Sequence, residues 1–142
     1  MNFVLDASVA LSWCFEDEGG EYAVGVLGAL RSSEAVAASH WPLEIANGLL
    51  SAERRRRVDA AAADEFARLL LSLPIVVEPV DRRLAIEEVR TLGREYGLTA
   101  YGAAYLELAR RLGVPLATLD VPLRQASEAA GVPIFQPDGH EA

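Results

Sequence analysis

Short apolar runs alternate along this chain with longer segments of helical periodicity. Two of the runs end at Asp6 and Asp120, and others occupy residues 35–38, 75–78 and 133–135. Runs of this length, bounded by turn-forming residues, are typical of buried strands. The segments between them predict helices over residues 9–15, 21–31, 39 to the arginines at 54–57, 59–72, 81–94, 99–112 and 122–130.

This alternation predicts one α/β domain, with a mainly parallel sheet covered by helices on both faces. The domain is expected over residues 1–135, and residues 136–142 are expected to be a frayed tail. A length of 142 residues with 51% hydrophobic content suffices for one proper core. The chain has a single cysteine, no apolar run of membrane-spanning length and no signal-peptide pattern, so we expect a soluble, cytoplasmic protein.

Asp6 and Asp120 are the first candidates for chemistry, because each follows a predicted strand. The carboxyl ends of parallel strands open into one crevice, where α/β proteins bind ligands. Two carboxylates meeting there suggest a divalent metal, since Mg²⁺ prefers oxygen ligands. The alternative is helix capping, which contributes about 1 kcal/mol and is the favoured interpretation of either residue taken alone.

Glu44 lies inside a predicted helix, for which Ser39 is the expected cap. Glu44, Asn47, Gly48 and Ser51 recur at helical spacing and form a narrow polar face beside the apolar stripe. A carboxylate on such a face can point inward, toward the crevice. The alternative, an ordinary solvated helix residue, is equally compatible with this segment.

Gly102 breaks a local rule at the start of another predicted helix. Thr99 is the expected N-cap, which puts Gly102 at the third helical position. That position favours an acid, and glycine there costs about 0.5–1 kcal/mol relative to alanine. Either the backbone is closely approached at Gly102, or a carboxylate has been lost there.

Four segments together carry a family resemblance: Val4-Leu5-Asp6-Ala7-Ser8, Pro42-Leu43-Glu44-Ile45-Ala46-Asn47, Leu98-Thr99-Ala100-Tyr101 followed by Ala103-Ala104-Tyr105, and Ala117-Thr118-Leu119-Asp120. In this order they resemble the PIN-domain ribonucleases, specifically the VapC-type toxins of type II toxin–antitoxin pairs. Haloacid-dehalogenase phosphatases also begin with an acid after a strand. They need a second acid two residues later, however, where this chain has Ser8.

The resemblance implies a three-layer α/β/α domain in which four acids hold Mg²⁺ or Mn²⁺ for RNA hydrolysis. Asp6, Glu44 and Asp120 match three of these acids, and Gly102 stands where the third of the four is expected. We therefore expect a metal-dependent endoribonuclease toxin with impaired activity, or alternatively a catalytically dead PIN module. The assigned roles are main metal ligand for Asp6, ligand or water-orienting base for Glu44, and ligand through water for Asp120. Ser8, Asn47 and Thr118 are expected to hold the carboxylates.

The implied partners are a cognate antitoxin, RNA and a second copy of the chain. A net charge of −8 opposes RNA binding, but residues 54–57 form a run of four arginines. That run has three interpretations: solvated complement of a helix dipole, RNA contact, or antitoxin contact. Any exposed member of the set Leu27, Leu30, Leu49 and Leu50 is expected to contribute to an apolar groove for the antitoxin. Tyr101 and Tyr105, one helical turn apart, suit either base stacking or helix packing.

Overall fold

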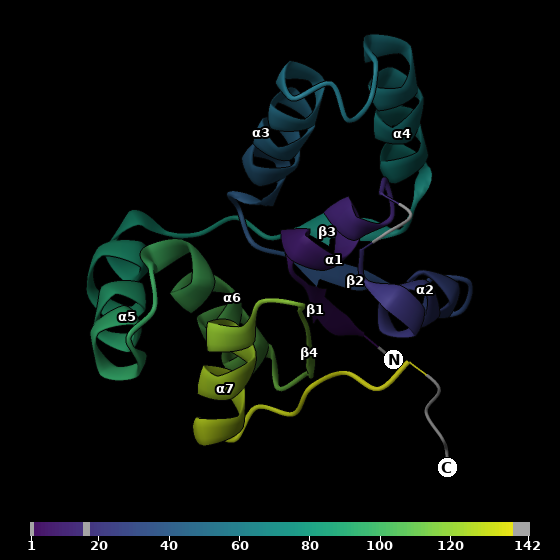
Figure 1. Ribbon diagram of the computed structural model, residues 1–142. Coiled ribbons are helices and arrows are strands. Elements are labelled where there is room, and N and C mark those ends of the chain that lie inside the picture. The colour runs from purple at the N-terminus through teal and green to yellow at the C-terminus, as the bar shows by residue number, and fades with distance from the viewer. Residues whose placement is uncertain (1, 16–17, 138–142) are drawn as a thin grey trace.

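A parallel sheet forms the centre of the molecule (Figure 1). The computed structural model describes residues 2–15 and 18–137. The strands are β1 (Phe3–Leu5), β2 (Ala35–Ala37), β3 (Ile75–Val77) and β4 (Leu116–Ala117), in the spatial order β3-β2-β1-β4. All three pairings are parallel, as predicted. The fifth predicted strand is reduced to a single parallel bridge between Leu116 and Ile134.

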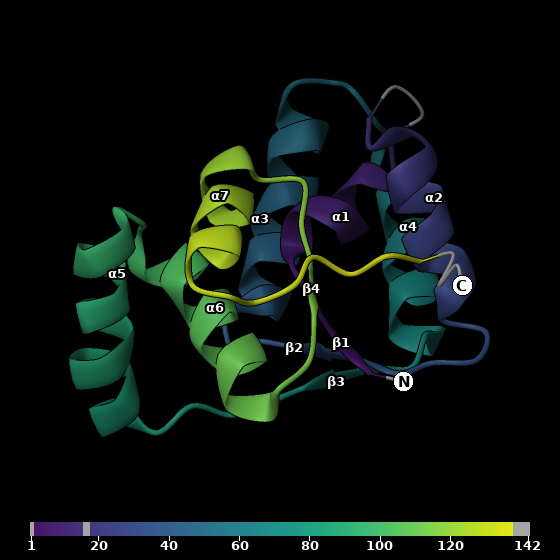
Figure 2. The same ribbon diagram turned by 90° about the horizontal axis from the view of Figure 1, so that it is seen from below.

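Helices cover both faces of this sheet. They are α1 (Ala7–Ser12), α2 (Gly20–Ala29), α3 (Trp41–Arg54), α4 (Ala60–Ser72), α5 (Arg90–Tyr96), α6 (Ala100–Leu112) and α7 (Val121–Ala129), with a π-helical turn η1 (Leu84–Val89) directly before α5. The helices α5, α6 and α7 lie on one side of the strands, whereas α2 and α4 lie on the other (Figures 1 and 2). The predicted three-layer α/β/α fold is confirmed.

The core explains why such short strands suffice. All three residues of β1 and all three of β2 are buried, because both faces of the inner strands are covered. The last described segment closes the sheet: the ring of Phe135 stacks on that of Phe3, and the hydroxyl of Tyr22 donates to the Phe135 carbonyl at 2.9 Å. Residues 138–142 of the predicted tail lie outside the described part of the chain.

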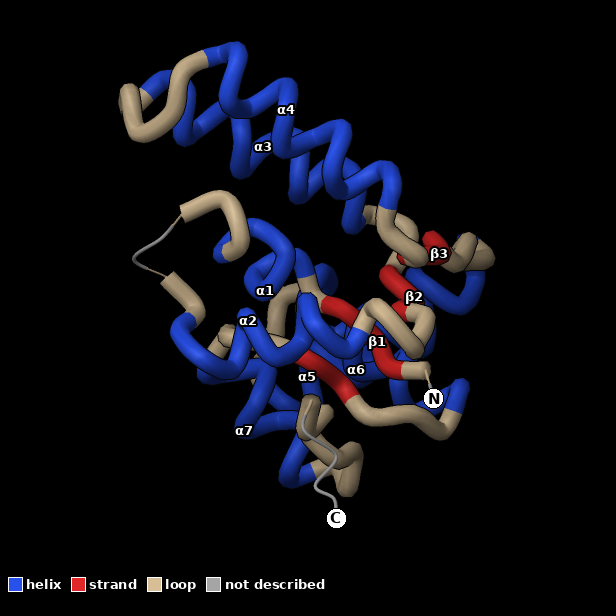
Figure 3. The backbone as a smooth tube through the Cα atoms, turned by 90° about the vertical axis from the view of Figure 1, so that its right-hand side faces the viewer, coloured by secondary structure: helices blue, strands red, loops and turns tan. Residues whose placement is uncertain are grey.

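The helices α3 and α4 form a hairpin that projects from the rest of the molecule (Figures 1 and 3). Between them and β3 lies an apolar cleft of about 360 Å³. Leu30 and Leu49 are buried and Leu27 is half-buried, so of the four leucines predicted to form a groove only Leu50 is exposed. No helix within residues 2–15 and 18–137 is long and apolar enough to cross a membrane.

Strand order determines where a ligand site can form. From β1 the chain moves outward through β2 to β3, and it then returns to place β4 on the other side of β1. The carboxyl ends of β1 and β4 therefore lie next to each other at a topological switch point. Asp6 follows β1 and its amide N–H donates to the carbonyl of Ala117, the last residue of β4, at 3.0 Å.

Candidate active site

Asp6 is a buried acid held by two hydroxyl groups. Its carboxylate Oδ2 accepts hydrogen bonds from Ser8 Oγ at 2.8 Å and from Thr118 Oγ1 at 2.6 Å. The residue stands at the N-cap position of α1 but makes no side-chain cap, so the capping interpretation is wrong for Asp6. Burial raises the pKa of Asp6, the hydroxyl bonds oppose that shift, and the charge of Asp120 adds to it.

Asp120 does cap a helix. Its Oδ2 accepts the backbone N–H of Leu123 at 3.0 Å, at the start of α7, while the residue stays exposed. Thr118 joins the two acids, because its hydroxyl accepts the backbone N–H of Asp120 at 3.0 Å and donates to Asp6. The side-chain orientation of Asp6 is therefore tied to the backbone at Asp120.

Glu44 faces the same cavity from α3. Its Oε1 accepts a hydrogen bond from the hydroxyl of Tyr105, and His40 Nε2 lies 3.5 Å from the same oxygen. The Glu44 side chain is 35% exposed, so it is neither buried nor simply solvated. The predicted Ser39 cap is wrong, since α3 begins after His40 and no side chain caps it.

Tyr105, which the sequence suggested only for base stacking or helix packing, is a functional candidate through its bond to Glu44. The residue is 1% exposed, and burial first, then its bond to Glu44 and the negative charge of Asp6, raise its pKa above the usual range. Its hydroxyl thus stays protonated and remains a donor to Glu44. The His40 ring packs edge-on against Tyr105, at 4.9 Å between ring centroids, and the i,i+4 spacing of His40 and Glu44 was the signal available in the sequence.

Gly102 lines the cavity, and a Cβ atom there would meet only ordinary contacts. Thr99 caps α6 as predicted, accepting the Gly102 N–H at 3.2 Å. A Cβ atom on Gly102 would lie 3.7 Å from Thr99 Oγ1 and 3.9 Å from Leu98 Cβ, which are ordinary contacts. At Gly48, by contrast, a Cβ would lie 2.6 Å from Leu11 Cδ1. The Leu11 side chain therefore packs closely on the backbone of Gly48, whereas no such close contact accounts for glycine at position 102.

These groups line one cavity of about 410 Å³. Its lining comprises Asp6, Ala7, Ser8, Leu11, Glu44, Asn47, Gly48, Thr99, Tyr101, Gly102, Tyr105, Asp120 and Leu123. The lining offers carboxylate, hydroxyl and amide oxygens and contains no basic side chain, which suits a hard divalent cation better than an anion. Within the described residues, no three acidic, histidine or cysteine side chains are close enough together to hold a metal ion.

Comparison with known proteins identifies the family. Residues 3–129 match the family model of the PIN domain. This chain belongs to the PIN domain family. No curated protein sequence matches it significantly.

Solved structures agree with this PIN fold. VapBC2 from Rickettsia felis, bound to a DNA fragment from its promoter, aligns with a TM-score of 0.66 and 12% identity over 95% of this chain and 98% of that one. VapC20 from Mycobacterium tuberculosis, a toxin that cleaves the sarcin–ricin loop, aligns with a TM-score of 0.62 and 19% identity over 95% and 99%. A toxin–antitoxin complex from Klebsiella pneumoniae gives 0.62 and 19% over 95% and 97%. At these identities the likeness establishes the fold.

Proposed function

We propose that this PIN domain is a metal-dependent endoribonuclease toxin of a toxin–antitoxin pair, with activity impaired by glycine at position 102. The observation that carries the proposal is a buried carboxylate, Asp6, that shares a cavity with Glu44 and Asp120 and has no cationic side chain beside it among the residues that the structure describes. Burying a charge without a partner is costly, and a bound cation would relieve that cost.

Asp6 is the proposed main ligand for Mg²⁺ or Mn²⁺, with Asp120 binding through water. Such an ion would activate water and neutralise charge on the scissile phosphate. Ser8 and Thr118 hold the Asp6 carboxylate in one orientation, as supporting hydrogen bonds do in metal sites. Tyr105 holds Glu44 toward the cavity, where Glu44 orients the attacking water or binds the ion.

Glycine at position 102 supports both the proposed impairment of cleavage and the alternative function, a PIN module that does not cleave. A carboxylate there would extend from the first turn of α6 into a cavity that has room for it. Without it, three acids remain, and they do not converge closely among the described residues. The alternative function, a PIN module that binds antitoxin or RNA without cleaving, rests on the same two observations.

The proposed partners follow from the related proteins. Two of the similar structures are described as a toxin–antitoxin complex and as a toxin that cleaves the sarcin–ricin loop, which supports a cognate antitoxin for this chain. We also propose a homodimer, and a cytoplasmic location consistent with the lone, half-buried Cys14. RNA is the proposed substrate.

The deciding experiment compares RNA cleavage by the unsubstituted chain and by Gly102→Asp, with Mn²⁺ supplied. We expect Gly102→Asp to cleave at least about tenfold faster, equivalent to about 1.4 kcal/mol of transition-state stabilisation. Adding Asp6→Asn to either form should abolish both cleavage and Mn²⁺ binding, since it removes charge and keeps shape. Equal cleavage by both forms, insensitive to Asp6→Asn, would show that the nuclease assignment is wrong.

The same variants separate the alternative function. Gly102→Ala is the matched control, because it adds the Cβ atom and helix propensity without a carboxylate. Should Gly102→Asp bind Mn²⁺ more tightly yet cleave no RNA, the non-cleaving PIN module becomes the better description. Metal affinity is measured by calorimetric titration on the purified proteins.

A further inference from the structure

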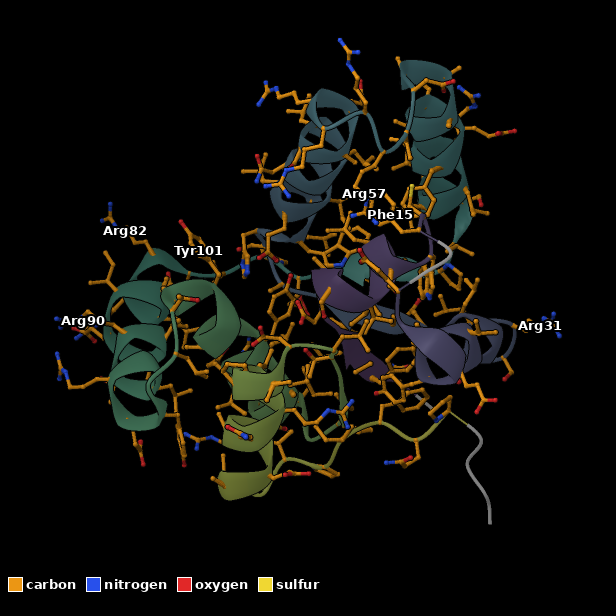
Figure 4. The ribbon with its side chains drawn as sticks, in the orientation of Figure 1. Phe15, Arg31, Arg57, Arg82, Arg90 and Tyr101 are labelled. Carbon is orange, nitrogen blue, oxygen red and sulfur yellow. The ribbon has the colours of Figure 1, made fainter. Side chains whose placement is uncertain are left out.

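The last residue of α3 and the turn that follows it present three exposed arginines, Arg54, Arg55 and Arg56, which we call the arginine turn. Their side chains form no hydrogen bond or ion pair with any other residue that the structure describes. The fourth arginine, Arg57, is anchored instead: its Nη2 lies 3.0 Å from Glu18, and its guanidinium lies 4.0 Å from the centre of the Phe15 ring (Figure 4). The anchor fixes the turn against the body of the protein and leaves three guanidinium groups in solvent.

The backbone of the arginine turn adopts a conformation that glycine normally supplies. Two hydrogen bonds close the end of α3: the Arg57 N–H donates to the Ala52 carbonyl at 2.9 Å, and the Arg56 N–H donates to the Glu53 carbonyl at 3.0 Å. This is the Schellman arrangement, and it places Arg56 in the left-handed region with a φ of 60°. For an arginine that conformation is strained.

The other helix ends of this kind use glycine. Gly97 after α5, Gly113 after α6 and Gly131 after α7 have φ values of 67°, 69° and 78°. Among the residues that the structure describes, Arg56 is the single non-glycine residue with positive φ. Glycine would end α3 in the same way without backbone strain. The presence of arginine at position 56 therefore points to a function of its side chain.

The arginine turn and Glu44 lie along the same side of α3. Arg55 follows Glu44 by eleven residues, close to three whole turns of helix, so both face the same side of α3 about 16 Å apart. Gly48 and Ser51 lie between them on that side. The cavity beside Glu44 is acidic and the chain carries a net charge of −8, so an RNA strand needs a cationic anchor outside the cavity.

We propose that the arginine turn binds the phosphate backbone of an RNA strand that runs along α3 into the cavity. This inference rests on the proposed function, in which RNA is the substrate. Arginine suits the task because its planar guanidinium pairs with phosphate through two hydrogen bonds. Contacts of this kind carry no sequence information, so the turn would position a strand without selecting the cleavage site.

Binding of RNA without cleavage tests the proposal. A fluorescent single strand of about ten nucleotides is titrated with metal-free protein, in chelator, and anisotropy is followed over a range of salt concentrations. Arg54→Gln, Arg55→Gln and Arg56→Gly should each weaken binding about three- to tenfold at low salt. Each should also reduce the slope of log affinity against log salt by about 0.7.

Arg31→Gln is the matched control. Arg31 is exposed just after α2, on a side of the molecule away from the arginine turn (Figure 4), and its replacement removes the same charge. It should leave both the affinity and the salt slope nearly unchanged. Equal weakening by Arg31→Gln and Arg55→Gln would mean that net charge alone governs binding, and the proposal would fall.

Arg56→Gly provides a second readout with the opposite sign. Glycine relieves the left-handed strain, so the melting temperature should rise by about 2 °C while RNA affinity falls. Undiminished RNA affinity in Arg56→Gly would overturn the proposal. If the arginine variants lose binding to a poly-glutamate peptide but keep RNA binding, the turn recognises an acidic protein segment instead.

One further variant distinguishes failure of the arginine-turn proposal from failure of the proposed nuclease function. Placing Arg55→Gln in the Gly102→Asp background should raise the KM for RNA and leave kcat nearly unchanged, because Arg55 contacts no reacting atom. Cleavage by Gly102→Asp that is indifferent to Arg55→Gln refutes the path along α3 and leaves the nuclease standing. If no form cleaves RNA, the proposed function fails, while the anisotropy measurements still decide whether the turn binds RNA.

Discussion

At the scale of single residues, Asp6 carries the largest conflict between folding and function. A carboxyl group with 6% exposure is accepted where a hydrophobic residue would pack without penalty. Two hydroxyl groups stabilise its ionised form but do not outweigh burial, since the net shift in the pKa of Asp6 is upward. The buried carboxylate of Asp6 therefore lowers the stability of the fold at the position of the proposed main metal ligand.

Asp6→Asn should therefore stabilise the metal-free protein in a pH-dependent way. Because its pKa is raised in the fold, the folded chain holds a proton that the unfolded chain releases, and the free energy of unfolding falls as pH rises above about 4. Asparagine removes that loss. Melting temperatures in chelator should favour Asp6→Asn at pH 7, and the advantage should shrink toward pH 4. A difference that is constant with pH would assign the effect to packing instead.

Substitutions at Gly102 should separate the effect of helix propensity on stability from the effect of an added negative charge. Gly102→Ala should stabilise the fold by about 0.5–1 kcal/mol, because the added Cβ meets only ordinary contacts. Gly102→Asp gains less in the absence of metal, since its charge lies near Asp6 and Asp120. Thermal unfolding with and without Mn²⁺ should show a larger metal-induced shift for Gly102→Asp than for Gly102→Ala. Misfolding of both variants would restore the packing explanation.

At the scale of elements, the sequence predicted the order of strands and helices because their apolar patterns are local. Three features escaped it. The helix α1 begins at Ala7, two residues before the predicted start, and Asp6 before it bonds to Thr118 on a distant segment as well as to Ser8. The π-helical turn η1 depends on tertiary packing around Val89, and the fifth strand shrinks to the bridge at Ile134. Each depends on contacts between distant segments, which periodicity does not record.

The acids of the candidate site could be predicted from local sequence patterns, but the contacts between distant segments that orient them could not. Strand ends and helix positions brought Asp6, Glu44 and Asp120 to one cavity. The bond from Tyr105 to Glu44 joins residues that are 61 positions apart, so no local pattern announces it. Sequence reasoning identified the acids, whereas the groups that orient them required the fold.

The first turn of α6 connects helix capping to the site. Thr99→Ala removes the acceptor for the Gly102 N–H and should cost about 1 kcal/mol of stability, or about 2–4 °C in melting temperature. Thr99→Ser keeps the acceptor and should cost less. In the Gly102→Asp background, a frayed turn should also lower Mn²⁺-dependent cleavage. Unchanged stability in Thr99→Ala would mean that water replaces the cap at no cost.

At the scale of the whole molecule, partner binding and catalysis should be separable. The third expected acid is missing from the cavity, but the exposed apolar surface, including Leu50 and the cleft between α3 and α4, is unaffected by that loss. A chain with impaired cleavage can therefore retain its antitoxin.

Co-expression with the cognate antitoxin should yield a stable complex even without cleavage. Light scattering on the purified complex should give a mass that contains two copies of this chain, as the proposed homodimer requires. Gly102→Asp should form the same complex, because the substitution lies inside the cavity. A soluble, monomeric chain that never co-purifies with the antitoxin would contradict both partner assignments.

The two margins of the sheet are unequal. Beyond β4 the segment around Ile134 supplies hydrogen bonds, but β3 ends the sheet on the other side with Val76 and Val77 44% and 38% exposed. An uncovered apolar margin is a template for adding further strands from other molecules. Because only this edge is free among the described strands, crowding the unbound protein is expected to pair two copies through β3, and such a pair leaves no second open edge for further growth.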